Sequence, residues 1–131
     1  MREIKFRGKT TTGKWVYGYY FYGYADYSYR ETKDKKHWIE GYDENNNYYI
    51  YEVIPETVGQ FTGLHDKNGK EIFEGDIVNI TSGIGNFINK KGAVIFTEGA
   101  FHIEGQGFTL SFASQYSLEV IGNIHDKEAA L

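Results

Sequence analysis

The sequence predicts a mostly β protein, and its aromatic and glycine content carries that prediction. The 131 residues include twelve tyrosines, nine phenylalanines and two tryptophans, so aromatic side chains make up 18% of the chain. Sixteen glycines are about 12% of the residues, against roughly 7% in an average protein. Aromatic and β-branched side chains fit a half-buried pleated surface, and glycines supply the positive φ angles of tight turns. We therefore expect a strongly bent sheet or a small barrel, with helices that are few and short.

The first 54 residues are expected to form a tyrosine-rich β lobe. Residues 1–7 alternate apolar and charged side chains, which is typical of a strand with the charged side chains on one face. Residues 15–22 carry rings on both faces, so this strand is either packed on both sides or exposes an aromatic surface. Residues 24–36 are polar and weakly periodic, and are expected to be a long excursion. Further strands are expected at residues 37–40 and 48–54, separated by a turn at 43–47 and ended by Pro55, which lacks an amide donor.

Residues 55–131 are expected to form a barrel-like part of the same single domain, which spans residues 1–131. Asn68 and Gly69 suit a turn with positive φ and predict a hairpin tip. The segment from Gly75 to Val78 follows a tight turn and is similar to the entry of an SH3-like barrel. Strands are then expected near residues 92–97, 100–104, 108–112 and 118–125, followed by a short C-terminal helix at residues 126–131.

A recognisable pattern occupies the middle of the chain and both of its ends. It consists of the 26-residue run VIPETVGQFTGLHDKNGKEIFEGDIV at residues 53–78, MREIKFRG at residues 1–8 and LEVIGNI at residues 118–124. In these three stretches the chain resembles the YopX-like family of phage and prophage proteins. The motif positions that carry the resemblance are Gly59, Phe61, Gly63, Leu64, Asp66, Gly69, Gly75 and Asp76.

The resemblance implies a phage or prophage origin, a β-rich fold and a homo-oligomer. It implies no biochemistry, because the family is functionally unassigned and supplies no catalytic residues that can be transferred to this chain. Catalytic residues, cofactors and metal ligands are therefore expected to be absent.

Charge and cysteine content exclude several classes of function. The net charge of −4 disfavours a dedicated duplex-DNA-binding protein, which normally has a basic surplus. The chain has no cysteine, which excludes disulfides, thiol catalysis and cysteine-ligated metals. No apolar run has the length of a membrane span, so we expect a cytosolic protein that does not bind membranes. The phage resemblance implies that this is the cytosol of the bacterial host.

Several acidic residues and histidines lie close together, and each group has a structural and a functional interpretation. Residues 65–71 contain oxygen ligands suited to calcium, but their spacing differs from that of an EF-hand, and a hairpin tip is the favoured interpretation. The pairs His65-Asp66 and His125-Asp126 are favoured as strand ends, since neighbours on a strand point to opposite faces. Glu74 and Asp76 flank a glycine and are expected to cap a turn. A small enzyme with a rim of His65, Asp66, Glu74 and Asp76 remains an unfavoured alternative.

The most unusual feature is a tyrosine belt, defined as the tyrosines between Tyr17 and Tyr29 together with Tyr48, Tyr49 and Tyr51. Tyrosine combines a flat apolar ring with a polar tip and suits both interfaces and base stacking. We expect a non-enzymatic accessory protein that self-assembles and binds a host or phage macromolecule. Because Lys33, Lys35 and Lys36 are close in sequence, single-stranded nucleic acid is an alternative ligand that the overall acidity disfavours. The candidate interface residues are Tyr17, Tyr19, Tyr20, Tyr22, Tyr24, Tyr49 and Tyr51.

Overall fold

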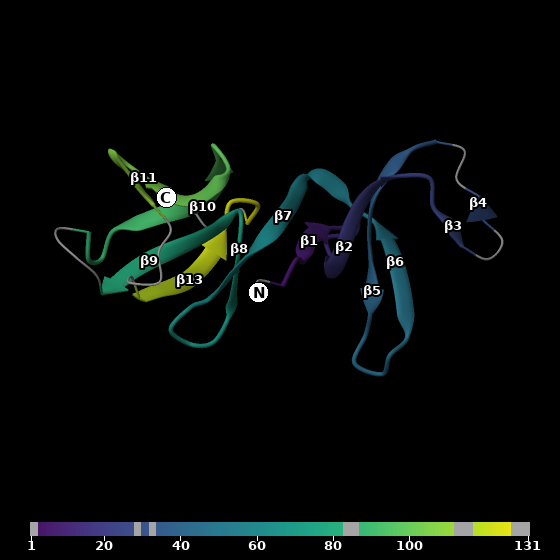
Figure 1. Ribbon diagram of the computed structural model, residues 1–131, viewed down its shortest axis with the longest axis horizontal. Helices are drawn as coiled ribbons and strands as arrows, with labels where there is room; N and C mark the ends of the chain where they lie inside the picture. Colours follow the sequence, from purple (N-terminus) through teal and green to yellow (C-terminus); the bar gives the residue numbers. More distant parts are fainter. Residues whose placement is uncertain (1–2, 28–29, 32–33, 83–86, 112–116, 127–131) are drawn as a thin grey trace. The chain divides into compact units, whose positions relative to one another are not determined.

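The computed structural model shows a protein built from β-strands (Figure 1). It describes residues 3–27, 30–31, 34–82, 87–111 and 117–126, and every regular element in these ranges is a strand. The strands are β1 (Phe6–Lys9), β2 (Trp15–Gly23), β3 (Asp26–Tyr27), β4 (Arg30–Glu31), β5 (Lys36–Tyr42), β6 (Tyr48–Glu52), β7 (Ile54–His65), β8 (Glu71–Phe73), β9 (Asp76–Ser82), β10 (Lys91–Thr97), β11 (Ala100–Gly105), β12 (Phe108–Ser111) and β13 (Ser117–Asn123).

The mostly β prediction is confirmed, but two of its details are not. The two large sheets are antiparallel and open, so the small SH3-like barrel is not formed. The short C-terminal helix is not supported either. Asp126 lies in a bend that follows β13, and residues 127–131 are outside the described ranges. The described residues contain no helix of the length and apolar character needed to cross a membrane.

The chain divides into two compact units, Met1–Gln60 and Phe61–Leu131, and the long strand β7 passes from the first to the second. In the first unit the strands run in the order β6-β5-β2-β1-β7, and the short pair β3-β4 forms a separate two-stranded ribbon. In the second unit the end of β7 pairs with β8, and a five-stranded sheet has the order β12-β11-β10-β9-β13. Each unit thus has its own antiparallel sheet.

The first unit has a small core on one face of its sheet. Val16, Ile39 and Val53 are buried together, and Phe6, Tyr20 and Val58 pack against them in partly buried positions. With so few aliphatic side chains available, aromatic rings provide much of the apolar contact in this unit.

Two positions in the first unit differ from the sequence expectation. Arg7 was expected on a charged face of the first strand, but it is buried with 5% of its surface exposed. Its guanidinium carbon lies 4.9 Å from the centroid of the Trp15 ring, and this stacking lets a planar cation be accommodated inside the unit.

Pro55 was expected to end a strand, but it lies inside β7. There the pairing with β1 is irregular, and the Thr57 hydroxyl accepts the Lys9 amide at 2.8 Å and donates to the Ile54 carbonyl at 2.6 Å.

The second unit has a larger aliphatic core. Its buried cluster draws on β8, β9, β10, β11 and β13, and the partly buried side chains of Phe87, Phe108, Leu110 and Val120 pack around it. The cluster consists of Ile72, Val78, Ile80, Val94, Phe101, Ile103 and Leu118. Buried β-branched and aromatic side chains on successive strands explain why the expected strands in this half are all present.

Candidate functional site

Two glycines create an unusual junction between β2 and β5 in the first unit. The β2–β5 register begins at Tyr19 opposite Glu40, so Gly18 and Gly41 lie just beyond the paired region. Gly18 has a φ of 151°, and a Cβ added there would overlap the backbone carbonyl oxygen of Glu40. A Cβ at Gly41 would lie 2.9 Å from the Tyr49 hydroxyl oxygen. Glycine is therefore required at Gly18 for the strands to approach this closely.

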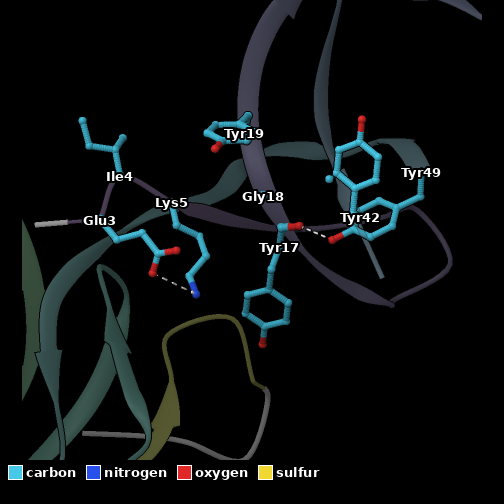
Figure 2. Close-up of a pocket in the computed structure, with 9 residues that line it drawn as sticks. Glu3, Ile4, Lys5, Tyr17, Gly18, Tyr19, Tyr42 and Tyr49 are labelled. Atoms are coloured by element: carbon cyan, nitrogen blue, oxygen red, sulfur yellow. Dashed lines mark hydrogen bonds and ion pairs between the residues drawn. The ribbon is translucent and has the colours of Figure 1, made fainter. Parts of the chain in front are cut away.

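Tyr49 bridges this junction. It is directly opposite Gly41 in the β5–β6 register, so no side chain on β5 blocks its ring. The hydroxyl of Tyr49 donates a hydrogen bond to the backbone carbonyl of Tyr17 on β2 (Figure 2). A tyrosine side chain on the edge strand thus supports the sheet where the regular ladder between β2 and β5 has stopped.

Beside this junction the first unit has a cleft of about 290 Å³, which we call the tyrosine cleft. Figure 2 shows the tyrosine rings that β2, β5 and β6 contribute to the cleft, together with Gly18 on β2. At its edge the Lys5 ammonium lies 3.6 Å from the Glu3 carboxylate. Tyr19 and Tyr42 are the most exposed rings, each with 64% of its surface accessible. The cleft is lined by Glu3, Ile4, Lys5, Tyr17, Gly18, Tyr19, Gly41, Tyr42 and Tyr49.

The exposed rings continue from the cleft onto the β5–β6 hairpin. The Tyr42 and Tyr48 rings meet edge to face with centroids 5.7 Å apart. The Tyr48 hydroxyl donates to the Glu40 carboxylate at 2.6 Å. This hydrogen bond, together with desolvation and the negative charge of Glu40, raises the pKa of Tyr48 to about 12. The Tyr48 hydroxyl is therefore held as a donor throughout the neutral range.

The other predicted belt residues are divided between the surface and the core. Tyr20 belongs to the partly buried set of the first core, where its ring stacks on His37 and its hydroxyl lies 2.6 Å from the His37 Nδ1 atom. Tyr22 is exposed, and its ring also contacts His37, with 4.6 Å between the two ring centroids. Tyr24 is exposed, and the centroid of its ring lies 6.0 Å from the Lys35 ammonium nitrogen. Tyr51 lies beside Tyr49, at 5.7 Å between ring centroids.

Sequence reasoning did not include Tyr42 or the two glycines of the junction. Tyr42 was overlooked because it stands alone before the turn at residues 43–47, whereas the belt was recognised from closely spaced tyrosines. The signal was available, since a hairpin with that turn places Tyr42 opposite Tyr48. Gly18 and Gly41 interrupt aromatic strands, a pattern typical of close backbone approach.

Asp66, a motif residue and candidate site residue, stabilises a turn in the second unit through backbone hydrogen bonds. Only 7% of its surface is exposed. One carboxylate oxygen accepts the amides of Asn68 and Lys70 at 2.8 and 2.9 Å, and the other accepts the Val120 amide on β13 at 3.0 Å. Burial raises the pKa of Asp66, but these three hydrogen bonds and the Lys70 charge outweigh it, so the net pKa is lowered. The carboxylate is fully engaged by backbone donors.

Asp76, His65 and His125 each have their own local contacts. Asp76 is buried and accepts the Phe73 amide at 2.8 Å across the tight turn at Gly75, whose φ is 93°. His65 packs edge to face on Phe61. The His125 amide donates to the side chain of Asn123 at 2.8 Å. In the described ranges no three His, Asp or Glu side chains are grouped so that they could hold a metal ion.

The comparison with protein families adds an identification. A family model described as YopX protein matches residues 5–131, nearly the whole chain. The chain belongs to the YopX family. A comparison with curated proteins found no match.

Most residues of the YopX motif have structural roles in this protein: they pair strands or form turns. Gly59 pairs with Arg7 across β7 and β1, and Phe61 pairs with Phe73 across β7 and β8. Asp66 and Asp76 organise turns through backbone amides, as described above, and Gly75 donates its amide to the Val94 carbonyl at 2.8 Å. Gly63 and Gly69 have φ values of 90° and 84°. Leu64 lies in β7. The motif therefore specifies how β7, β8 and β9 connect.

Proposed function

We propose that this YopX family member is a non-enzymatic accessory protein of a phage or prophage that works in the bacterial host cytosol. It self-assembles, and it binds a host or phage protein through the exposed tyrosines of its first unit. The single observation that carries this proposal is the concentration of exposed tyrosines in that unit. The following paragraphs give the support for each part.

Every exposed tyrosine among the described residues belongs to the first unit. Tyrosine buries a large rigid ring with little loss of side-chain entropy and offers a hydroxyl to a partner, which is why it is enriched at protein interfaces. Isolated exposed apolar residues are ordinary, whereas a group of rings around a cleft is not. The exposed tyrosines are Tyr17, Tyr19, Tyr22, Tyr24, Tyr42, Tyr48 and Tyr51.

Charge favours a protein over a nucleic acid as the partner. Residues 1–60 contain nine basic and nine acidic residues, so the tyrosine-bearing unit has no basic surplus. Lys36 lies 3.4 Å from the Glu52 carboxylate, which offsets its charge. A phosphate backbone is best bound by a surplus of cations, which this unit lacks, whereas a protein interface needs only the rings and their hydroxyl groups.

The geometry of the acidic residues supports a non-enzymatic role. A general acid or base must present its carboxylate to a substrate, usually with a pKa moved toward neutrality. Asp66 has the opposite properties, because its oxygens accept backbone amides and its pKa is lowered. Asp76 is buried with 1% of its surface exposed.

The test is quantitative affinity capture from lysate of infected host cells, with the wild-type chain and a Tyr19→Ser, Tyr42→Ser double variant. We expect the double variant to retain at least tenfold less of any specific partner, since both rings are exposed and neither belongs to a buried cluster. The matched control is Ile88→Ser with Ile121→Ser, which removes exposed apolar surface from the second unit. Equal loss in both double variants, or no loss in the tyrosine variant, would contradict the proposed binding surface.

A parallel measurement separates the nucleic-acid alternative. Fluorescence anisotropy with a single-stranded oligonucleotide should show no binding at 150 mM salt. Tight, salt-sensitive binding that is lost in a Lys35→Ala, Lys36→Ala variant would overturn the choice of a protein partner.

A further inference from the structure

Strand β6 is the outer strand of the first unit's sheet. Among the described residues it pairs on one side with β5 and on the other side with no strand (Figure 1). An edge strand presents unpaired backbone N–H and C=O groups, and these can form a ladder with another chain. β6 therefore offers a template for strand addition.

The backbone hydrogen bonds around the β5–β6 hairpin show which β6 residues present these groups. The Val53 amide donates to the His37 carbonyl, and the Asp43 amide donates to the Asn47 carbonyl, both at 2.9 Å. In an antiparallel pair, hydrogen-bonded and non-hydrogen-bonded positions alternate. By this alternation Tyr49 and Tyr51 direct their backbone groups toward β5. The residues that direct them toward the open edge are Tyr48, Ile50 and Glu52.

Strand β6 lacks most of the features that natural proteins use to block an edge, and its one charged residue, Glu52, is at its end. Its sequence, YYIYE, contains no proline, no lysine and no glycine, and its register with β5 is continuous. The second unit protects one of its own edges, because the outer side of β13 is covered by the turn after β7. The Lys67 amide donates to the Leu118 carbonyl at 2.8 Å, and Asp66 accepts the Val120 amide. Edges are thus blocked in one part of this chain and open in another.

We propose that β6 pairs antiparallel with β6 of a second copy of this chain, with a two-fold axis at Ile50. This inference rests on the self-assembly part of the proposed function and specifies the surface that performs it. With Ile50 opposite Ile50, Tyr48 lies opposite Glu52 of the second copy. All three residues present outward backbone groups, so the pairing satisfies both edges at once with about six hydrogen bonds.

The side chains of this register are also compatible with each other. Glu52 is the only charged residue of β6, and the register places it opposite a tyrosine rather than opposite another carboxylate. On the other face of the sheet, Tyr49 of one copy lies opposite Tyr51 of the second. Tyr49 and Tyr51 already contact each other within one chain, at 5.7 Å between ring centroids, and the Tyr49 hydroxyl bonds the Tyr17 carbonyl on β2, so the pairing places uncharged tyrosines opposite each other and no like charges.

The chain has no cysteine, so one introduced thiol tests the register directly. In an Ile50→Cys variant the two Cα atoms at the axis would be about 5.5 Å apart, within the range for a disulfide. We expect most of the chain to form a covalent dimer under mild oxidation. The control is Asn45→Cys in the turn of the same hairpin, where the register separates the two thiols by roughly 34 Å and no dimer should form. Equal cross-linking in both variants would overturn the register.

A second variant tests the edge without oxidation. Ile50→Lys places two ammonium groups on the axis and leaves the hydrogen bonds to β5 intact, so circular dichroism should remain that of the wild type. Sedimentation velocity over a concentration series should show at least a twofold fall in mass toward the chain mass of 15.1 kDa. The control, Thr109→Lys on the outer strand β12 of the other sheet, should retain the wild-type mass.

The outcomes distinguish this inference from the proposed function. A wild-type chain that stays monomeric at every concentration overturns both self-assembly and β6 pairing. A wild-type oligomer whose mass is unaffected by Ile50→Lys overturns β6 pairing alone and leaves self-assembly through another surface.

Discussion

The β5–β6 and β7–β8 hairpins have the same turn but different surroundings. In the first, the Asp43 amide bonds the Asn47 carbonyl, and one Asp43 carboxylate oxygen accepts the Asn45 and Asn47 amides. In the second, Asp66 makes the same contacts with Lys70 and Asn68. Both turns place a residue with positive φ three positions after the aspartate. An aspartate that bonds amides two and four residues later is therefore a local solution that the chain uses twice.

The two turns differ in what the second carboxylate oxygen contacts. In Asp66 it accepts the Val120 amide and ties the hairpin to the edge of β13. The second carboxylate oxygen of Asp43 accepts only from the Asn47 side chain among the described residues, at 3.4 Å, and the hairpin is exposed. The same local structure thus closes an edge in the second unit and leaves the β6 edge open in the first. Local turn chemistry and edge protection are separate properties.

The largest expected effect comes from removing Asp66, the aspartate of the second turn. Asp66→Ala should lower the free energy of unfolding of the second unit by about 3 kcal/mol, since three amides lose a charged acceptor in a buried position. Asp43→Ala should cost much less, because water can replace the carboxylate at an exposed turn. Chemical denaturation measures both. In hydrogen exchange the Val120 amide should lose protection only in Asp66→Ala, and similar costs in the two variants would remove the distinction between the turns.

Low pH should weaken the hydrogen bonds between the Asp66 carboxylate and its backbone amides, including that of Val120. The pKa of Asp66 is lowered below its ordinary value of 3.8, so its stabilising effect is fully present above pH 3.8 and is lost as the pH falls through the folded-state pKa. The stability difference between the wild type and Asp66→Asn should therefore be constant from pH 7 to about pH 5 and shrink below pH 3.8. Thermal unfolding of both proteins between pH 7 and pH 2 gives the comparison. A difference that persists at pH 2 would show that charge is not what ties the turn to β13.

An exchange between the turns tests their equivalence. Asn46 has a φ of 63° in the first turn, and Gly69 has a φ of 84° in the second. Because glycine adopts this conformation without a Cβ penalty, Asn46→Gly should raise stability by about 0.5 kcal/mol, and Gly69→Asn should lower it by about the same amount. Space is not limiting at Gly69, where an added Cβ meets nothing within 4 Å. Urea titrations of the two variants should give opposite shifts of the midpoint, and shifts of the same sign would indicate that the turns are not equivalent.

The smallest effect concerns the Tyr48 hydroxyl at the open edge. Glu40→Gln removes the carboxylate whose hydrogen bond raises the pKa of Tyr48, so that pKa should fall from about 12 toward its ordinary value of 10.0. A pH titration followed by NMR of ring-labelled tyrosine measures it. The matched control is Glu44→Gln, which leaves Glu40 in place, so the pKa of Tyr48 should stay at about 12 in that variant.

Much of the secondary structure could be predicted from particular residues. The turn at residues 43–47 and the hairpin tip at Asn68 and Gly69 are local, because the aspartate, asparagine and glycine chemistry needs only a few neighbours. Strands β9 to β13 could be predicted from β-branched and aromatic residues with polar turns between them, whereas β8, at Glu71–Phe73, lies in a segment that was interpreted as a tight turn. Arg7 was misplaced because its stacking partner, Trp15, comes from the neighbouring strand β2, and Pro55 was misplaced because the Thr57 hydroxyl beside it bonds the Lys9 amide, 48 residues earlier in the chain than Thr57.

Composition and short-range pattern were enough to predict that this protein is mostly β and that its first unit is rich in tyrosine. Tertiary structure decided that Tyr20 is packed beside His37 while Tyr19 and Tyr42 border a cleft. It also decided that Asp66 covers one sheet edge while β6 is left without a strand partner among the described residues. Burial and edge pairing depend on which distant segments come together, and a side chain carries no local signal of what will lie opposite it.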